Sequence, residues 1–99
     1  MLKSISPLEL KQKLAAQEEL LLVDVRDSFE FEEGHLPAIN IPMAEMFDNL
    51  DKLQKDKPVV FYCRTGLRGK ALVYMLSKMY AYENLINLEG GYEAYHSLN

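Results

Sequence analysis

The segment 58–69, PVVFYCRTGLRG, carries the clearest structural signals in this 99-residue chain. Its opening run, PVVFY, is almost entirely apolar, which is typical of a strand buried on both faces. Cys63 follows the run directly, and from Leu67 onward apolar residues recur at helical spacing. The segment therefore predicts a strand, a tight turn that carries the cysteine, and a helix.

Further apolar runs on both sides of this segment alternate with helical patterns. Besides the strand at 58–62, strands are expected at 20–25, 38–41 and 85–88, and helices at about 7–17, 27–33, 43–53, 67–80 and 92–98. The first helix has a complete start signal, with Ser6 as N-cap, Pro7 at its first position and Glu9 closing a capping box. This alternation predicts one α/β domain, residues 1–99, with a mainly parallel central sheet flanked by helices.

Polar and reactive side chains lie where two of these strands end. Asp24 and Arg26 close one strand, and Cys63 follows another. Ligands of open parallel sheets bind beyond the carboxyl ends of the strands. We therefore expect a site at this edge of the sheet.

Composition excludes several classes of function. The formal charge of −4 and the isoelectric point of about 5.1 argue against general nucleic-acid binding, which usually needs a basic surface. No apolar stretch has the length of a signal peptide or a membrane span, so we expect no membrane partner and a cytoplasmic location. A single cysteine forms no internal disulfide, and its spacing from His35 and His96 matches no metal site, so no metal is expected.

The turn after Cys63 is suited to a nucleophilic thiolate. Arg64 and Arg68 are two of the three arginines in the chain, so the turn should be a cationic spot that attracts small anions. Gly66 permits close approach of the backbone, and the unpaired N–H groups of a helix start favour an anion. Such surroundings favour the thiolate form of a cysteine. No histidine adjoins Cys63 as a base, which argues against a papain-like hydrolase.

Two reactions that start from a cysteine already in its thiolate form are phosphoryl transfer and sulfur transfer. Four residues separate Cys63 from Arg68. Cysteine phosphatases use a loop that is one residue longer, because it must enclose three phosphoryl oxygens. The shorter loop favours a persulfide, which is a smaller group.

Several motifs in this order and spacing resemble those of a single-domain rhodanese, a thiosulfate-type sulfurtransferase, over essentially the whole chain. They are LVDVR (22–26), EF (30–31), GHLP (34–37), AINIP (38–42), VVFYCRTGLR (59–68) and NLEGGY (87–92). The resemblance implies a rhodanese-like fold with Cys63 as the sulfur-accepting nucleophile. It also implies a substrate-binding loop that consists of Arg64, Thr65, Gly66, Leu67 and Arg68. Asp24 and Arg26 would support the site as scaffold, and His35 would be a structural hydrogen-bonding residue.

The implied activity moves a sulfane sulfur from a small anionic donor such as thiosulfate to cyanide or a thiol, through a Cys63 persulfide. No cofactor is expected, because sulfur itself is the transferred group. With no second cysteine to resolve the persulfide, the site should be open to an external acceptor. Rhodanese-like modules also serve as persulfide carriers or regulatory binding units, and here the acidic patch Glu30, Glu32 and Glu33 would dock a protein partner. A phosphatase or an arsenate reductase is the remaining alternative.

The chain departs from the family pattern at three places. No glycine separates Pro37 from Ala38, and Tyr95 replaces the usual tryptophan of the last helix. Gly69 stands where a serine or threonine commonly follows the loop arginine. The last of these departures removes a hydroxyl group near the expected persulfide.

Overall fold

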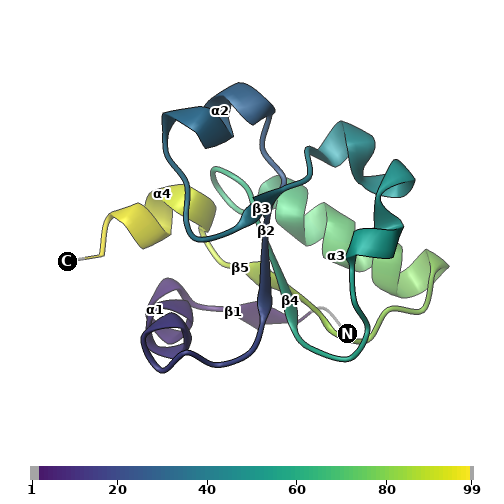
Figure 1. Cartoon of the computed structure of the whole chain (residues 1–99), viewed down its shortest axis with the longest axis horizontal. Helices are drawn as coiled ribbons and strands as arrows, with labels where there is room; N and C mark the ends of the chain where they lie inside the picture. Colours follow the sequence, from purple (N-terminus) through teal and green to yellow (C-terminus); the bar gives the residue numbers. More distant parts are fainter. Residues whose placement is uncertain (1–2, 99) are drawn as a thin grey trace.

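The computed structural model describes residues 3–98 and contains one five-stranded parallel sheet (Figure 1). The strands are β1 (Ser4–Ile5), β2 (Leu21–Asp24), β3 (Ile39–Asn40), β4 (Val59–Tyr62) and β5 (Leu85–Leu88). Their order across the sheet is β1-β5-β4-β2-β3. Every neighbouring pair is parallel, so all carboxyl ends lie at one edge. The expected α/β fold with a parallel sheet is confirmed.

Helices cover both faces of this sheet. They are α1 (Pro7–Ala15), α2 (Ser28–Glu33), α3 (Leu67–Met79) and α4 (Gly91–His96), with the 3₁₀ segments η1 (Met43–Asp48) and η2 (Leu50–Lys52). In Figure 1, α1 and α4 lie on one side of the sheet and α3 with the 3₁₀ segments on the other. Among residues 3–98, no helix combines the length and the apolar character needed to cross a membrane.

Alternation along β4 places its side chains in two separate cores. Val59 and Phe61 pack with α3 and the 3₁₀ segments, and Cys63 continues this series. Val60 and Tyr62 pack on the opposite face, with α1 and α4. The side chains of Cys63 and Tyr62 therefore pack on opposite faces of the sheet.

The strand order creates a switch point between β2 and β4. From β2 the chain moves outward to β3, whereas from β4 it moves the other way, to β5. A crevice forms at the carboxyl edge where the connections diverge in this way. Asp24 and Cys63 border this point on neighbouring strands, as Asp24 pairs with Tyr62.

Two expected elements differ from those in the structure. The helix expected at 43–53 consists of two 3₁₀ segments, because the side chain of Asn49 donates a hydrogen bond to the Glu45 carbonyl at 2.8 Å and competes with the helical pattern. Strand β1 was not expected, because it is only a two-residue element and its pairing partner is the distant β5. The capping box of α1 is confirmed at Ser6 and Glu9.

Candidate active site

Cys63 lies directly after β4, inside the turn that leads into α3. Its sulfur accepts a hydrogen bond from the Gly66 backbone N–H at 3.0 Å. Gly66 has a φ of +100°, and a side chain there would come within 3.1 Å of the Gly90 nitrogen. Glycine is therefore required both for the backbone conformation and for the close contact. The backbone of the turn thus points a donor at the thiol.

Helix α4 holds this turn from the opposite side of the sheet. The Tyr92 N–H donates to the Cys63 carbonyl at 2.7 Å, and the Glu93 N–H donates to the Arg64 carbonyl at 3.0 Å. A β-carbon on Gly91, whose φ is +63°, would lie 2.4 Å from the Cys63 carbonyl oxygen. Gly90 and Gly91 were identified only as part of the NLEGGY motif, and their contact with the cysteine loop was not predicted from the sequence. The glycine pair after a buried strand was the available signal.

The expectation that the site is open to solvent is wrong for the thiol itself. Cys63 is 1% exposed, because its side chain points inward among the apolar residues that pack on α3. The next two residues of the turn, Arg64 and Thr65, are exposed. An external molecule therefore meets the rim of the loop before it meets the sulfur.

The two loop arginines do not form a free cationic spot. The Arg64 Nε lies 3.6 Å from a carboxylate oxygen of Glu93, and an Arg68 guanidinium nitrogen lies 3.7 Å from a carboxylate oxygen of Glu30. Both pairs are partly or largely solvated, so each is a weak interaction. They nevertheless offset the positive charge that the sequence placed on the loop. Leu67, between the arginines, is 74% exposed.

Asp24 and Arg26 form a buried ion pair beside the loop. The Arg26 Nε lies 3.0 and 3.1 Å from the two carboxylate oxygens of Asp24, and Nη2 lies 2.7 Å from one of them. Nη2 also donates to the Gly34 carbonyl at 2.7 Å, which fixes the end of α2. Burial alone would lower the pKa of Arg26, but the hydrogen bonds and charge of Asp24 raise it, so the guanidinium stays charged.

Tyr62 and Tyr92 connect this pair to the rest of the site. The Arg26 guanidinium carbon lies 4.3 Å from the centre of the Tyr92 ring, which itself stacks near Tyr62. The Tyr62 hydroxyl accepts a hydrogen bond from the Leu36 N–H at 3.1 Å, and burial raises the pKa of Tyr62. The turn after α2 is thereby linked to β4 through Tyr62 and to α4 through Arg26 and Tyr92.

His35 lies at the surface of that turn. Its Nδ1 lies 2.6 Å from the Leu36 carbonyl, and its ring stacks on Phe31 with centroids 3.7 Å apart. Among residues 3–98, no side chain of the cysteine loop contacts it through a hydrogen bond or ion pair.

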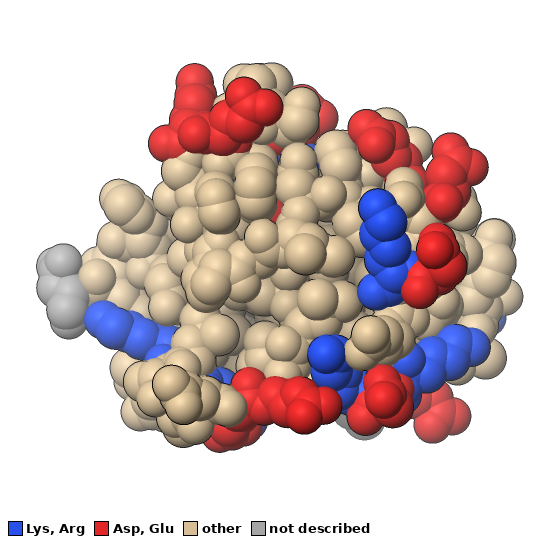
Figure 2. Space-filling model, in the orientation of Figure 1, with Lys and Arg blue, Asp and Glu red and all other residues tan. Residues whose placement is uncertain are grey.

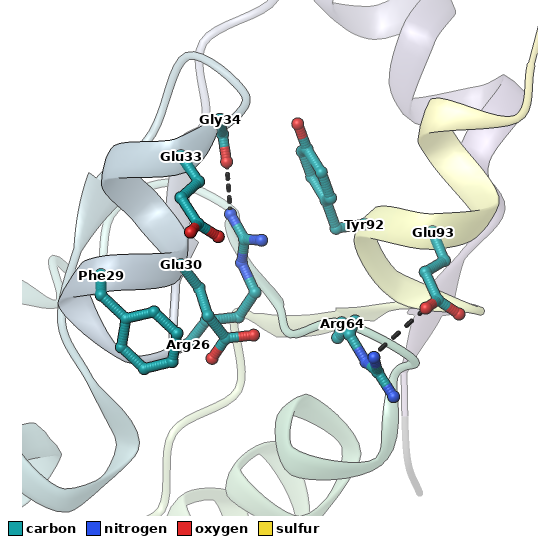
Figure 3. A pocket seen from close by; sticks show the side chains of 8 residues that line it. All are labelled: Arg26, Phe29, Glu30, Glu33, Gly34, Arg64, Tyr92 and Glu93. Carbon is teal, nitrogen blue, oxygen red and sulfur yellow. Dashed lines mark hydrogen bonds and ion pairs between the residues drawn. The ribbon is translucent and has the colours of Figure 1, made fainter.

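A cavity of about 490 Å³ adjoins the loop between α2 and α4 (Figure 3). Its walls carry charged, aromatic and backbone groups from both helices and from the two strand ends. The lining residues are Arg26, Phe29, Glu30, Glu33, Gly34, Arg64, Tyr92 and Glu93. Cys63 does not line it, whereas the next residue, Arg64, does. The structure therefore brings Arg26 and Arg64 to one cavity, and leaves Thr65, Leu67 and the thiol outside it.

The departure at Gly69 has a structural reason. A β-carbon at this position would lie 2.4 Å from the side-chain oxygen of Asn87, which reaches across from β5. Asn87 is 5% exposed, and this oxygen has no hydrogen-bond partner among the described residues. Asn87 thus occupies the space that a side chain at 69 would need.

Within residues 3–98, no three histidine, cysteine, aspartate or glutamate side chains are grouped as metal ligands. The site contains a single thiol with a backbone hydrogen-bond donor, the two loop arginines Arg64 and Arg68, and a charged cavity beside them. Such a set can hold a sulfur-centred nucleophile and select the molecules that approach it.

Comparison with known proteins agrees with this geometry. The rhodanese-like domain family model matches residues 6–98. A Bacillus subtilis protein is 39% identical over 95% of this chain and 90% of its own length. A sulfurtransferase of Allochromatium vinosum is 37% identical over 92% of this chain and 85% of its own.

Solved structures share the fold as well. The crystal structure of a rhodanese-like domain protein from Staphylococcus aureus superposes with a TM-score of 0.83 at 35% identity, and covers 95% of this chain and 91% of that one. The chain therefore belongs to the rhodanese-like domain family, among relatives that include sulfurtransferases.

Proposed function

We propose that this protein is a sulfurtransferase that carries a sulfane sulfur on Cys63. The donor is a small anion such as thiosulfate, and the acceptor is cyanide or a thiol. The observation that carries the proposal is the 3.0 Å hydrogen bond from the Gly66 N–H to the Cys63 sulfur. This donor already points at the sulfur, so it can hydrogen-bond to the negative charge on sulfur during the transfer without reorganisation.

In the first half-reaction, the Cys63 thiolate attacks the outer sulfur of thiosulfate. A new S–S bond forms, the bond between the two sulfurs of thiosulfate breaks, and sulfite leaves with the electron pair. Arg64 and Arg68 guide the anion, although Glu93 and Glu30 beside them reduce the attraction. The family resemblance and the loop length support sulfur over phosphorus as the atom attacked.

In the second half-reaction, the acceptor attacks the outer sulfur of the persulfide. The bond to Cys63 breaks, and its electron pair restores the thiolate. The outer sulfur projects about 2 Å beyond the cysteine sulfur, the length of an S–S bond. In this half-reaction the acceptor therefore needs to reach only the added atom, and not the buried Cys63 sulfur.

The proposal is tested by the intact mass of the protein after thiosulfate and again after cyanide, beside Cys63→Ser. We expect a gain of one sulfur atom that cyanide removes and that the variant does not show. No gain with thiosulfate or with a persulfide donor would overturn the assignment.

A second candidate function is a persulfide carrier that docks on a protein acceptor. Phe29 is 61% exposed on α2, and Glu32 is exposed beside it. Figure 2 shows acidic side chains gathered over this helix. A basic partner would fit such a surface.

The carrier hypothesis is tested with the variant Glu32→Lys, because Glu32 does not line the cavity. Sulfur transfer to a peptide with a cysteine between lysines should slow, while transfer to cyanide should not change. Equal rates to the peptide in both proteins would eliminate this docking surface. Glu18→Lys, an exposed carboxylate on another part of the chain, is the matched control.

A further inference from the structure

The cavity beside the loop carries both signs of charge at its surface. Glu30, Glu33 and Glu93 supply carboxylates, while Arg26 and Arg64 supply guanidinium groups (Figure 3). Phe29 and Tyr92 add aromatic surface. A small ligand that carries a positive group and a negative group matches this lining better than an anion does.

Arg26 is the deep contact of the cavity. The residue is 5% exposed, and its Nε and Nη2 are engaged by Asp24 and Gly34. Its Nη1 has no hydrogen-bond partner among residues 3–98, and in Figure 3 it points toward the Tyr92 side of the cavity. A buried, permanently charged donor with a free N–H is an expected partner for a carboxylate.

Glu33 is the available carboxylate. Glu30 is paired with Arg68 and Glu93 with Arg64, whereas Glu33 makes no ion pair with residues 3–98. It lines the same cavity and is exposed. An ammonium group bound in the cavity therefore has one carboxylate that need not first release an arginine.

The cavity is also connected to both ends of the active-site loop. Arg64, which follows Cys63, forms part of its wall, and Glu30 on another wall contacts Arg68 at the loop's end. A ligand held here therefore lies beside Arg64 and the Glu30–Arg68 pair, next to the loop that would carry the persulfide.

We infer that this cavity binds an amino-acid-type thiol, with its carboxylate on Arg26 and its ammonium on Glu33, as the acceptor of the Cys63 sulfur. The inference rests on the proposed function. The acceptor thiolate attacks the outer sulfur of the protonated persulfide, and the bond from that sulfur to Cys63 breaks. Cys63 leaves as thiolate, and the product is the hydropersulfide of the acceptor, so no oxidant or reductant is needed.

Three thiols distinguish the contribution of the ammonium group from that of the carboxylate. L-Cysteine carries both, cysteamine carries only the ammonium, and 3-mercaptopropionate carries only the carboxylate. Cys63 is first loaded with thiosulfate, excess donor is removed, and the loss of the added sulfur is followed by intact mass at equal thiolate concentrations. We expect L-cysteine to discharge the protein fastest.

The same three thiols are then tested with the Glu33→Gln variant. Comparing the rate ratios of the two proteins cancels differences in intrinsic thiol reactivity. The rate ratio of L-cysteine to 3-mercaptopropionate should fall about fivefold in this variant, as expected for loss of one partly solvated ion pair. Glu32→Gln, the adjacent exposed carboxylate outside the cavity, should keep the wild-type ratio. An unchanged ratio in Glu33→Gln, or an equal fall in Glu32→Gln, would overturn the inference.

A binding measurement without sulfur transfer separates this inference from the proposed function. S-Methyl-L-cysteine has both charges and no thiol, and its titration into the unloaded protein is followed by amide chemical shifts. Shifts centred on Gly34 and Tyr92 that weaken in Glu33→Gln support the site even if thiosulfate fails to load Cys63. Shifts elsewhere, or none, contradict it even if loading succeeds.

Discussion

The loop at the end of β4 has an apolar side and a charged side. On the α3 side, the Cys63 sulfur is buried among apolar residues and receives a backbone N–H from Gly66. On the α2 and α4 side, the cavity is lined by charged side chains around Arg26. In the proposed function, the two sides have separate roles: the backbone positions the sulfur, and the charged side chains select the molecules that approach it.

The largest effect is expected from breaking the buried pair on the cavity side. Asp24→Asn should reduce the free energy of unfolding by about 3–5 kcal/mol, because it leaves the Arg26 charge buried without its partner. Chemical denaturation measures the loss. Glu18→Gln, which breaks the exposed pair with Lys13, should cost at most about 1 kcal/mol. Similar costs for the two variants would mean that the buried pair does not hold this side together.

The next effect tests the backbone side. Gly91→Ala should cost about 3 kcal/mol, since the added methyl group meets the Cys63 carbonyl and the residue has a positive φ. It should also slow sulfur uptake from thiosulfate, because the loop must move. Gly90→Ala shares the positive φ but meets only Ala94, so its uptake rate should stay near that of the wild type. Equal slowing in both variants would remove the proposed role of the close contact.

The smallest effect concerns the charges at the rim. Arg68→Ala should lower kcat/KM for thiosulfate by about fivefold, since the side chain is partly solvated and offset by Glu30. The loss should be smaller for a neutral persulfide donor, which gains nothing from the charge. Equal losses for both donors would show that Arg68 shapes the loop instead.

Glu30→Gln is the complementary variant for this rim pair. It retains a capping side chain for α2 and frees Arg68, so kcat/KM for thiosulfate should rise by a factor of about two. A fall would contradict the view that Glu30 offsets the loop charge. Lys70→Ala, another exposed cation in the first half of α3, is the control for a general effect of net charge.

The features that could be predicted from the sequence depend on local signals. The apolar run at 58–62, the cap at Ser6 and the glycine after Cys63 each act within a few residues, so the parallel fold and the loop were accessible from sequence. The resemblance over the whole chain added the family. The short strand β1 was not accessible, because its pairing partner is β5 at the other end of the chain.

The missing parts of the site are contacts between distant segments. Glu30 and Glu93 come from α2 and α4, and nothing in the spacing of the loop indicates that they lie beside its arginines. The fit of Asn87 against Gly69 likewise joins β5 to α3. The acidic run on α2 was recognised as a surface, but its place in a cavity beside the loop required the fold.

Release of sulfite in the absence of an acceptor tests whether Cys63 carries a covalent sulfur before any acceptor arrives. Purified protein is mixed with excess thiosulfate, and free sulfite is measured over the first turnovers. We expect a burst of sulfite equal to the concentration of protein, followed by a halt until cyanide or a thiol is added. Sulfite that appears only when the acceptor is present would contradict a persulfide intermediate and indicate direct transfer.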